Sequence, residues 1–247
     1  MLKKQLIFFL IIAFVLSMLS SCAYLLSHIV SPGNQKQYTA NVYITGLPKE
    51  IFDRTGANTY QDLKISETTL SIDFYVSGNK YVYTESKISS ISNGLTYDFP
   101  GPESNKITIQ ATFTISYSTD TSLIAYQSVV SIPIKEYTLP NNVKNFYVLI
   151  DIPYSDSSTP TVKLIDSARA YKFILRTQNS EIVRIFGSEN THVLLTTESA
   201  DYKQCTFVVD RTISNVYIFQ SESGVTKQGD PKPIGSGQDQ EVIDLSN

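Results

Sequence analysis

The feature that most constrains the fold is an unbroken alternation of apolar and polar residues in the middle of the chain. Over residues 107–117 every second residue is apolar: Ile107, Ile109, Ala111, Phe113, Ile115 and Tyr117. A period of two places successive side chains on opposite faces of a strand, so this stretch predicts a strand with one buried face. Residues 38–44 and 70–76 alternate in the same way, and no helical stripe is sustained. The chain is therefore predicted to be all-β.

The first predicted hairpin is centred on residues 78–79, Gly-Asn. Glycine at the first central position suits a two-residue type II′ turn. That turn would place Val76 opposite Tyr81 and Phe74 opposite Tyr83. The alternation then puts both tyrosines on the apolar face, in or beside the core.

Further turn signals divide the rest of the first half. Asn-Gly at residues 93–94 predicts a second hairpin between short segments ending at Ile91 and starting at Leu95. In the strand expected over residues 123–134, Pro133 indicates an edge or an end, because proline cannot donate to a ladder. Residues 143–152 predict a strand that becomes apolar on both faces toward its end.

A polar stretch bracketed by Pro153 and Pro160 is the best candidate for a domain boundary. We therefore expect two consecutive antiparallel, immunoglobulin-like β-sandwiches, with one continuous sandwich as the alternative. The expected parts are a sandwich at 38–153, a linker at 154–160, a smaller sandwich at 161–222 and a flexible tail at 223–247. Strands in the smaller sandwich are expected near 161–166, 169–177, 181–187, 191–197, 203–210 and 213–221.

The N-terminus has the pattern of an export signal. Lys3 and Lys4 precede an apolar run at residues 6–19 in which Ser17 is the one polar member. A basic start, a short apolar core and small residues before a cut site are typical of such signals.

The last residue of that run and the three that follow it, Leu19-Ser20-Ser21-Cys22, resemble the lipobox of bacterial lipoproteins. The resemblance implies cleavage between Ser21 and Cys22 and diacylation of Cys22, which becomes the mature N-terminus. Residues 1–21 would be the signal peptide and 22–37 a lipidated tether. The resemblance implies that the N-terminal lipid anchors the protein to the cell membrane or the outer membrane. It also implies that the body of the protein is extracytoplasmic.

Two alternatives to lipidation remain for this segment. The apolar stretch at residues 6–26 is long enough to cross a bilayer, which takes roughly 20 residues, so it would also serve as an uncleaved single-pass anchor. A plainly secreted protein is the other alternative. All three place the body outside the cytoplasm, because the two initial lysines favour a cytoplasmic N-terminus.

Charge excludes one class of partner. Removing residues 1–21, which contain Lys3, Lys4 and no acid, changes the formal net charge from −3 to −5. An acidic body argues against nucleic acid, which requires a basic face. No nucleic-acid partner is therefore predicted.

The chain has few residues suited to catalysis or metal binding. His28 falls in the tether, and His192 is expected at a strand end, so no histidine-rich metal site is predicted. Cys205 alternates with Phe207 and Val209, which predicts a reduced, buried thiol rather than a nucleophile. A hydrolase with a carboxylate pair, Asp151 being its first candidate, is a minor alternative. We predict no catalytic residue and no cofactor.

Tyrosine is the remaining compositional feature, with 16 residues in the chain. Tyr43, Tyr75 and Tyr147 stand opposite the apolar sets of their strands and are the candidate ligand-binding residues, because tyrosine combines apolar area with a polar tip. The expected function is a non-enzymatic envelope lipoprotein that binds or braces a partner. The alternative is a surface receptor for a glycan or another small ligand, with exposed tyrosines as its site.

Overall fold

A computed structural model describes most of the chain after residue 36. The described residues are 37–51, 63–101, 104–119, 126–139, 143–153, 159–177, 182–186, 191–195, 197–198, 202–213, 215–222, 225–228, 232–233 and 239–244. They are mostly β-strand, as predicted. Residues 37–247 cluster as one compact unit. The predicted signal peptide, most of the tether and residues 154–158 of the expected linker lie outside the described residues.

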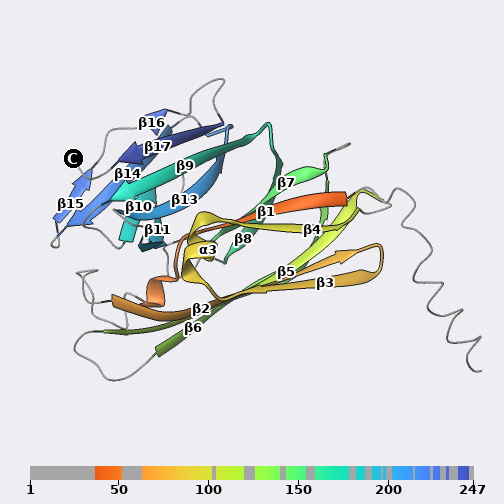
Figure 1. Ribbon diagram of the computed structural model, residues 1–247, viewed down its shortest axis with the longest axis horizontal. Helices are drawn as coiled ribbons and strands as arrows, with labels where there is room; N and C mark the ends of the chain where they lie inside the picture. The colour runs from red at the N-terminus through yellow and green to blue at the C-terminus, as the bar shows by residue number, and fades with distance from the viewer. Residues whose placement is uncertain are drawn as a thin grey trace, which may run out of the picture. The chain divides into compact units, whose positions relative to one another are not determined.

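The first half of the described chain builds two four-stranded sheets, in the orders β4-β1-β7-β8 and β3-β2-β5-β6. Figure 1 shows β2, β3, β5 and β6 side by side, with β1, β4, β7 and β8 in the next layer. The elements are β1 (Gln37–Thr45), β2 (Leu63–Val76), β3 (Asn79–Glu85), α3 (Ile88–Asn93), β4 (Leu95–Pro100), β5 (Lys106–Thr119), β6 (Tyr126–Thr138), β7 (Asn145–Asp151) and β8 (Thr161–Asp166).

A shared core fills the space between these two sheets. It takes Leu70, Ile72 and Phe74 from β2 and the alternating apolar residues of β5, and it meets Phe146, Val148 and Ile150 of β7. The strand predicted at 107–117 is confirmed. Its inward side chains are buried, while the polar residues between them are partly exposed.

The second half builds two further sheets. One has the order β12-β13-β9-β17, and the other has the order β11-β10-β14-β15 with β16 also paired to β14. The strands are β9 (Ala170–Thr177), β10 (Ile182–Phe186), β11 (Thr191–Leu195), β12 (Thr197–Glu198), β13 (Lys203–Asp210), β14 (Asn215–Glu222), β15 (Val225–Gln228), β16 (Lys232–Pro233) and β17 (Gln240–Asp244). A second core gathers residues of β9, β13, β14 and β17, with Phe173 stacked on Phe207 at its centre.

The expectation of purely antiparallel sheets is wrong at two pairs. β1 runs parallel to β7, and β17 runs parallel to β9. Both pairs join strands far apart in sequence, and only such long connections permit a parallel arrangement.

The predicted division between the halves also needs revision. β8, expected to open the second sandwich, pairs with β7 from Phe146–Asp166 to Asp151–Thr161. Val162 and Leu164 of β8 pack against the first core.

The first hairpin forms one turn position earlier than predicted. Ser77 and Gly78 occupy the turn with φ angles of 49° and 81°. Two positive φ angles are typical of a type I′ turn, whose twist matches the flanking strands. The pairing is Phe74 with Tyr81, not with Tyr83. Because the shift is two residues, Tyr81 and Tyr83 stay on the predicted face and pack against the core.

The second predicted hairpin is wrong, because Ile88–Asn93 forms the short helix α3. The three-residue spacing of Ile88 and Ile91 suits one helical face, and Ile91 is buried in the first core. Gly94 ends the helix with φ of 91°, and a Cβ there would lie 2.2 Å from the ring of Tyr43. The Asn-Gly pair therefore ends a helix and makes room for a tyrosine.

Pro133 lies in an edge strand, which is one of the two outcomes predicted. β6 is the last strand of its sheet and continues past the proline to Thr138. The register with β5 shifts opposite residues 133–134, so the proline sits in a bulge.

The expectation of a flexible tail at 223–247 is wrong for residues 225–228, 232–233 and 240–244, which form β15, β16 and β17. β17 adds to the edge of the sheet beside β9, and Ile243 is buried in the second core. Apolar residues return near the end of the chain, after the polar composition of 224–240 on which the expectation rested.

Candidate functional site

Tyr43 and Tyr147 were expected to be exposed, but they pack against each other. Tyr43 is buried and Tyr147 is partly buried. Tyr43 is 6% exposed, and its ring stacks on that of Tyr147 with centroids 5.8 Å apart. The expected exposure of Tyr43 is wrong because β9 and β13 cover this side of the β4-β1-β7-β8 sheet. Lys172 of β9 lies over the Tyr43 ring, with its Nζ 5.6 Å from the centroid. Burial raises the pKa of Tyr147.

A small third core joins the halves at this point. Tyr43, Leu149 and Ile165 come from the first half, and Ala170 and Val208 come from the second. The second face of the β4-β1-β7-β8 sheet is therefore covered around Tyr43 and Leu149, while Thr96 and Asp98 at its other end are exposed. We call this sheet the covered sheet. The expectation for residues 143–152, apolar on both faces, is confirmed by the consecutive buried residues Val148, Leu149 and Ile150.

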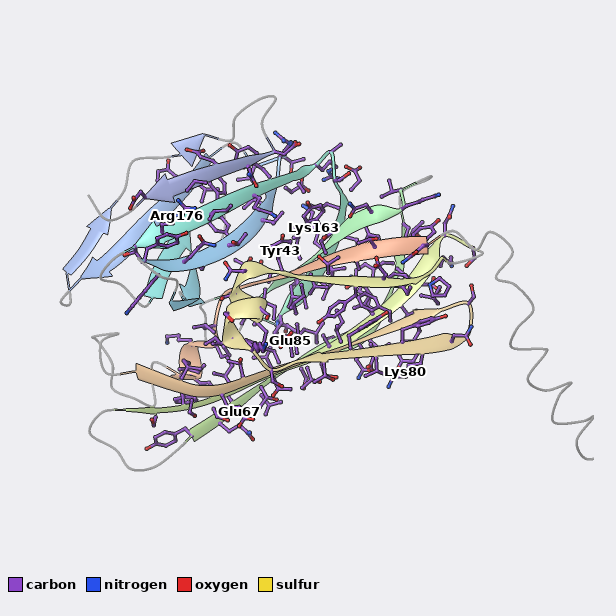
Figure 2. The ribbon with its side chains drawn as sticks, in the orientation of Figure 1. Tyr43, Glu67, Lys80, Glu85, Lys163 and Arg176 are labelled. Carbon is purple, nitrogen blue, oxygen red and sulfur yellow. The ribbon has the colours of Figure 1, made fainter. Side chains whose placement is uncertain are left out.

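An acidic residue that the sequence analysis missed strengthens this joint. Asp210, at the end of β13, is 2% exposed. Its carboxylate accepts hydrogen bonds from Arg169 and from the backbone N–H of Thr212, and it lies 2.5 Å from the Nζ of Lys163 on β8. Burial alone would raise the pKa of Asp210, but the bonds from Lys163, Thr212 and Arg169 lower it overall. Figure 2 labels Lys163 and Tyr43 on the side of the covered sheet that meets the second half.

Helix α3 makes a second polar link between the halves. The side-chain oxygen of Asn93 accepts hydrogen bonds from Gln204 and Thr206 of β13, each at 3.2 Å. A pocket of about 30 Å³ beside this link touches Ile91, Phe113 and Cys205 among others. That volume holds one or two water molecules, which is too little for a metabolite.

Cys205 is a buried, reduced thiol in the second core, as predicted. It is 1% exposed and unpaired, and it lies in the same core as Phe207, with Val209 packed against that core. Burial raises the pKa of Cys205 to about 12. A thiol with this pKa is almost entirely protonated at neutral pH, so its environment favours packing over nucleophilic attack.

Tyr75 occupies a different environment from the other two predicted tyrosines. It is partly exposed on the outer face of the β3-β2-β5-β6 sheet, between Lys80 on β3 and Thr108 on β5. The Lys80 Nζ is 5.6 Å from its ring centroid and 2.8 Å from the carboxylate of Asp73. The three candidate tyrosines are therefore divided between a closed joint and an outer face.

No described strand or helix packs on the outer face around Tyr75, so we call the β3-β2-β5-β6 sheet the open sheet. Val82 and Val129 on this face are each 55% exposed. Serine and threonine are frequent between these two valines, and one row of them crosses all four strands. The alternation within β2 and β5 already indicated a sheet with one solvent-facing side, since their apolar residues lie on one face and their polar residues on the other.

The remaining predicted residues add no further site. Ser21, Cys22 and His28 lie outside the described residues, as does the side chain of His192. The backbone of His192, in β11, pairs with that of Ile185 in β10. Asp151 ends β7 and pairs through its backbone with Thr45 and Thr161.

The described residues contain neither a metal-binding cluster nor a membrane-spanning helix. They hold no cluster of three or more metal-binding side chains of the His, Cys, Asp and Glu types. Within the same residues, no helix has the length and apolar character needed to cross a bilayer.

No protein-family model matches the chain, and no curated protein matches it.

Proposed function

We propose that this protein is a non-enzymatic lipoprotein of the bacterial cell envelope, anchored by a lipid on Cys22, that binds or braces a partner. The observation that carries the binding role is the contrast between the two large sheets. One is buried on its first face and on part of its second, where it joins the halves, while the other keeps a broad outer face free of any described element. A rigid body with one free sheet face is suited to holding a partner near a membrane.

The joint supports the bracing part of this proposal. A third core, the Asp210 cluster and the Asn93 link all connect the same two halves. Several independent contacts at one boundary resist hinge motion better than a linker does. The two halves would then move as one rigid body that presents the free face.

We infer the finer fold class in the same way. Each half is assigned to the immunoglobulin-like sandwiches, the first with β8 included, and the assignment is supported by the separate core that each pair of sheets encloses. Within these otherwise antiparallel sheets, the parallel pairs involve the first described strand, β1, which lies between β4 and β7, and the last, β17, which lies at the edge beside β9.

Attachment is tested by the intact mass of the N-terminal peptide from native protein. The expected peptide begins at Cys22 and carries lipid, and the protein partitions into detergent. Cys22→Ala should accumulate as an uncleaved precursor without lipid, whereas Ser20→Ala, which keeps a small residue beside the cut, should mature normally. A Cys22→Ala protein that matures to the native size would refute lipid anchoring.

A second candidate is a surface receptor for a glycan, because Tyr75 lies on the free face of the open sheet, while Tyr43 is buried in the joint and Tyr147 is partly buried beside it. The chemistry of the surface around Tyr75 decides what kind of ligand such a receptor would take.

A further inference from the structure

The outer face of the open sheet carries a row of four hydroxyl side chains. Thr84 on β3 pairs with Ser71 on β2, which pairs with Thr112 on β5, which in turn pairs with Ser131 on β6. Adjacent strands lie about 4.8 Å apart, so the row is a regular line of hydroxyl groups across the sheet. No hydrogen bond joins these four hydroxyls to another described residue.

The rows on either side are mixed. On one side, Thr69 lies beside Thr114, which lies beside Val129. On the other side, Val82, Asp73 and Gln110 form the next row, and Tyr75 lies beside Thr108 in the row after that. Each hydroxyl can donate one hydrogen bond and accept two. A surface of this composition matches a ligand that also presents hydroxyl groups, since either partner can donate.

Four charged side chains of this face form two ion pairs, to which Glu67, opposite Ser116, does not belong. Lys80 lies 2.8 Å from Asp73, and Lys106 lies 2.7 Å from Glu136. The bond to Asp73 raises the pKa of Lys80, so that ammonium group stays charged and paired. Glu67 lies apart from Lys80 along the sheet (Figure 2). A strongly charged ligand would have to compete with these ion pairs, so the face favours an uncharged one.

Apolar groups are also exposed among the hydroxyls. Val82 and Val129 are each 55% exposed on opposite edges of the face, and Tyr75 presents an aromatic ring near one end. Sugar rings combine hydroxyl groups with apolar C–H faces, and aromatic and aliphatic side chains pack against those faces. The exposed valines and the tyrosine therefore supply the contacts that hydroxyl groups alone would lack.

We propose that the outer face of the open sheet, centred on Ser71, Thr112 and Tyr75, binds an uncharged polysaccharide. The proposal rests on the envelope location of the protein and names the partner that the free face takes. The ligand lies across the strands, with hydroxyl groups on the threonine and serine rows and sugar faces against Tyr75 and the valines.

The test is affinity electrophoresis of the full mature chain, held in mild detergent, through gels that contain a defined polysaccharide. Neutral glucan, mannan and galactan are compared with anionic alginate and cationic chitosan. We expect at least one neutral polymer to retard the protein, with little retardation by the charged polymers. Thr112→Lys and Tyr75→Ala should each weaken the retardation at least tenfold.

The matched control is Thr161→Lys, which adds the same charge at an exposed position of β8, away from the open face. Its retardation should equal that of the wild type, and all variants should keep the wild-type unfolding temperature. If Thr112→Lys loses stability, Ser131→Lys at the more exposed edge strand replaces it.

Three results would overturn the proposal: no retardation by any neutral polymer, stronger retardation by a charged polymer, or retardation unchanged by Thr112→Lys and Tyr75→Ala. Self-association of the wild type that Thr112→Lys abolishes would instead identify a second copy of the chain as the occupant. Failure here is separable from failure of lipid anchoring, because Cys22→Ala changes the N-terminal mass and should leave polysaccharide retardation unchanged.

Discussion

The open sheet and the covered sheet share one core but differ in what lies on their other faces. In β5 of the open sheet, buried residues alternate with partly exposed ones from Ile107 to Tyr117. In β7 of the covered sheet, Val148, Leu149 and Ile150 are buried in succession. Strict alternation indicates one layer of packing, and a continuous apolar run indicates a layer on each side. The comparison therefore explains why one sheet joins the halves while the other is available to a partner.

The largest expected effect comes from placing a charge on the face of each sheet that points away from the shared core. Leu149→Glu puts a carboxylate in the third core, opposite Lys163 on β8, which Asp210 already holds in an ion pair. The loss of apolar packing and the burial of a second acid beside Asp210 should cost roughly 3–4 kcal/mol of unfolding free energy. Val129→Glu adds the same group to the open face, where the side chain is 55% exposed, and should change stability by about 0.5 kcal/mol or less. Chemical denaturation of both variants measures the difference.

If Leu149→Glu does not fold, Leu149→Ala provides the milder version, with a loss of about 2–3 kcal/mol. Equal costs for Leu149→Glu and Val129→Glu would mean that the two sheets are not covered differently.

A second prediction concerns where the first half ends. A fragment of residues 37–168 includes β8, and a fragment of residues 37–153 lacks it. The longer fragment should unfold cooperatively at a temperature at least about 5 °C higher, because β8 completes the ladder with β7 and packs Val162 and Leu164 against the core. Thermal unfolding followed by circular dichroism gives the comparison. Equal unfolding temperatures would show that β8 adds nothing to the first half.

Particular residues show which parts of the structure can be predicted from the sequence and which cannot. Local patterns predicted the strands, the face of Tyr81 and Tyr83, and the burial of Cys205, because alternation depends on near neighbours. The predicted exposure of Tyr43 is wrong because its burial depends on β9 and β13, more than a hundred residues away in the sequence. The parallel pairing of β1 with β7 is non-local for the same reason. The apolar run in β7 was the one available signal that a further layer covers that sheet.

A smaller effect is expected at Cys205, in the core of the second half. Cys205→Ser puts a hydroxyl in an apolar site, which costs roughly 1–3 kcal/mol if the hydroxyl finds no partner. Native Cys205 should resist alkylation by iodoacetamide until the protein is unfolded, because burial raises its pKa to about 12. Cys205→Ala keeps the site apolar and should cost less than serine. Rapid alkylation of the folded protein would contradict the predicted burial.

The smallest predicted effect concerns the ion cluster beside the covered sheet. Asp210→Asn keeps the shape of the side chain but removes the charge that Lys163 and Arg169 pair with. A fully buried pair loses roughly 3–5 kcal/mol when one partner is removed. Here the side chains of Lys163 and Arg169 are 53% and 48% exposed, so solvent screens both cations and the expected loss is about 1–2 kcal/mol.

The pH dependence of that loss distinguishes a charge effect from a packing effect. Because the folded pKa of Asp210 lies below the ordinary value of 3.8, its contribution is fully present above that value and is lost as the pH falls through the folded pKa. The difference in unfolding free energy between wild type and Asp210→Asn should therefore be largest at neutral pH and shrink below 3.8. Asp166→Asn, which removes a carboxylate from the nearby turn but not from the cluster, is the control. A difference that stays constant as the pH falls would assign the effect to packing, and the ion cluster would then contribute nothing to holding the second half on the covered sheet.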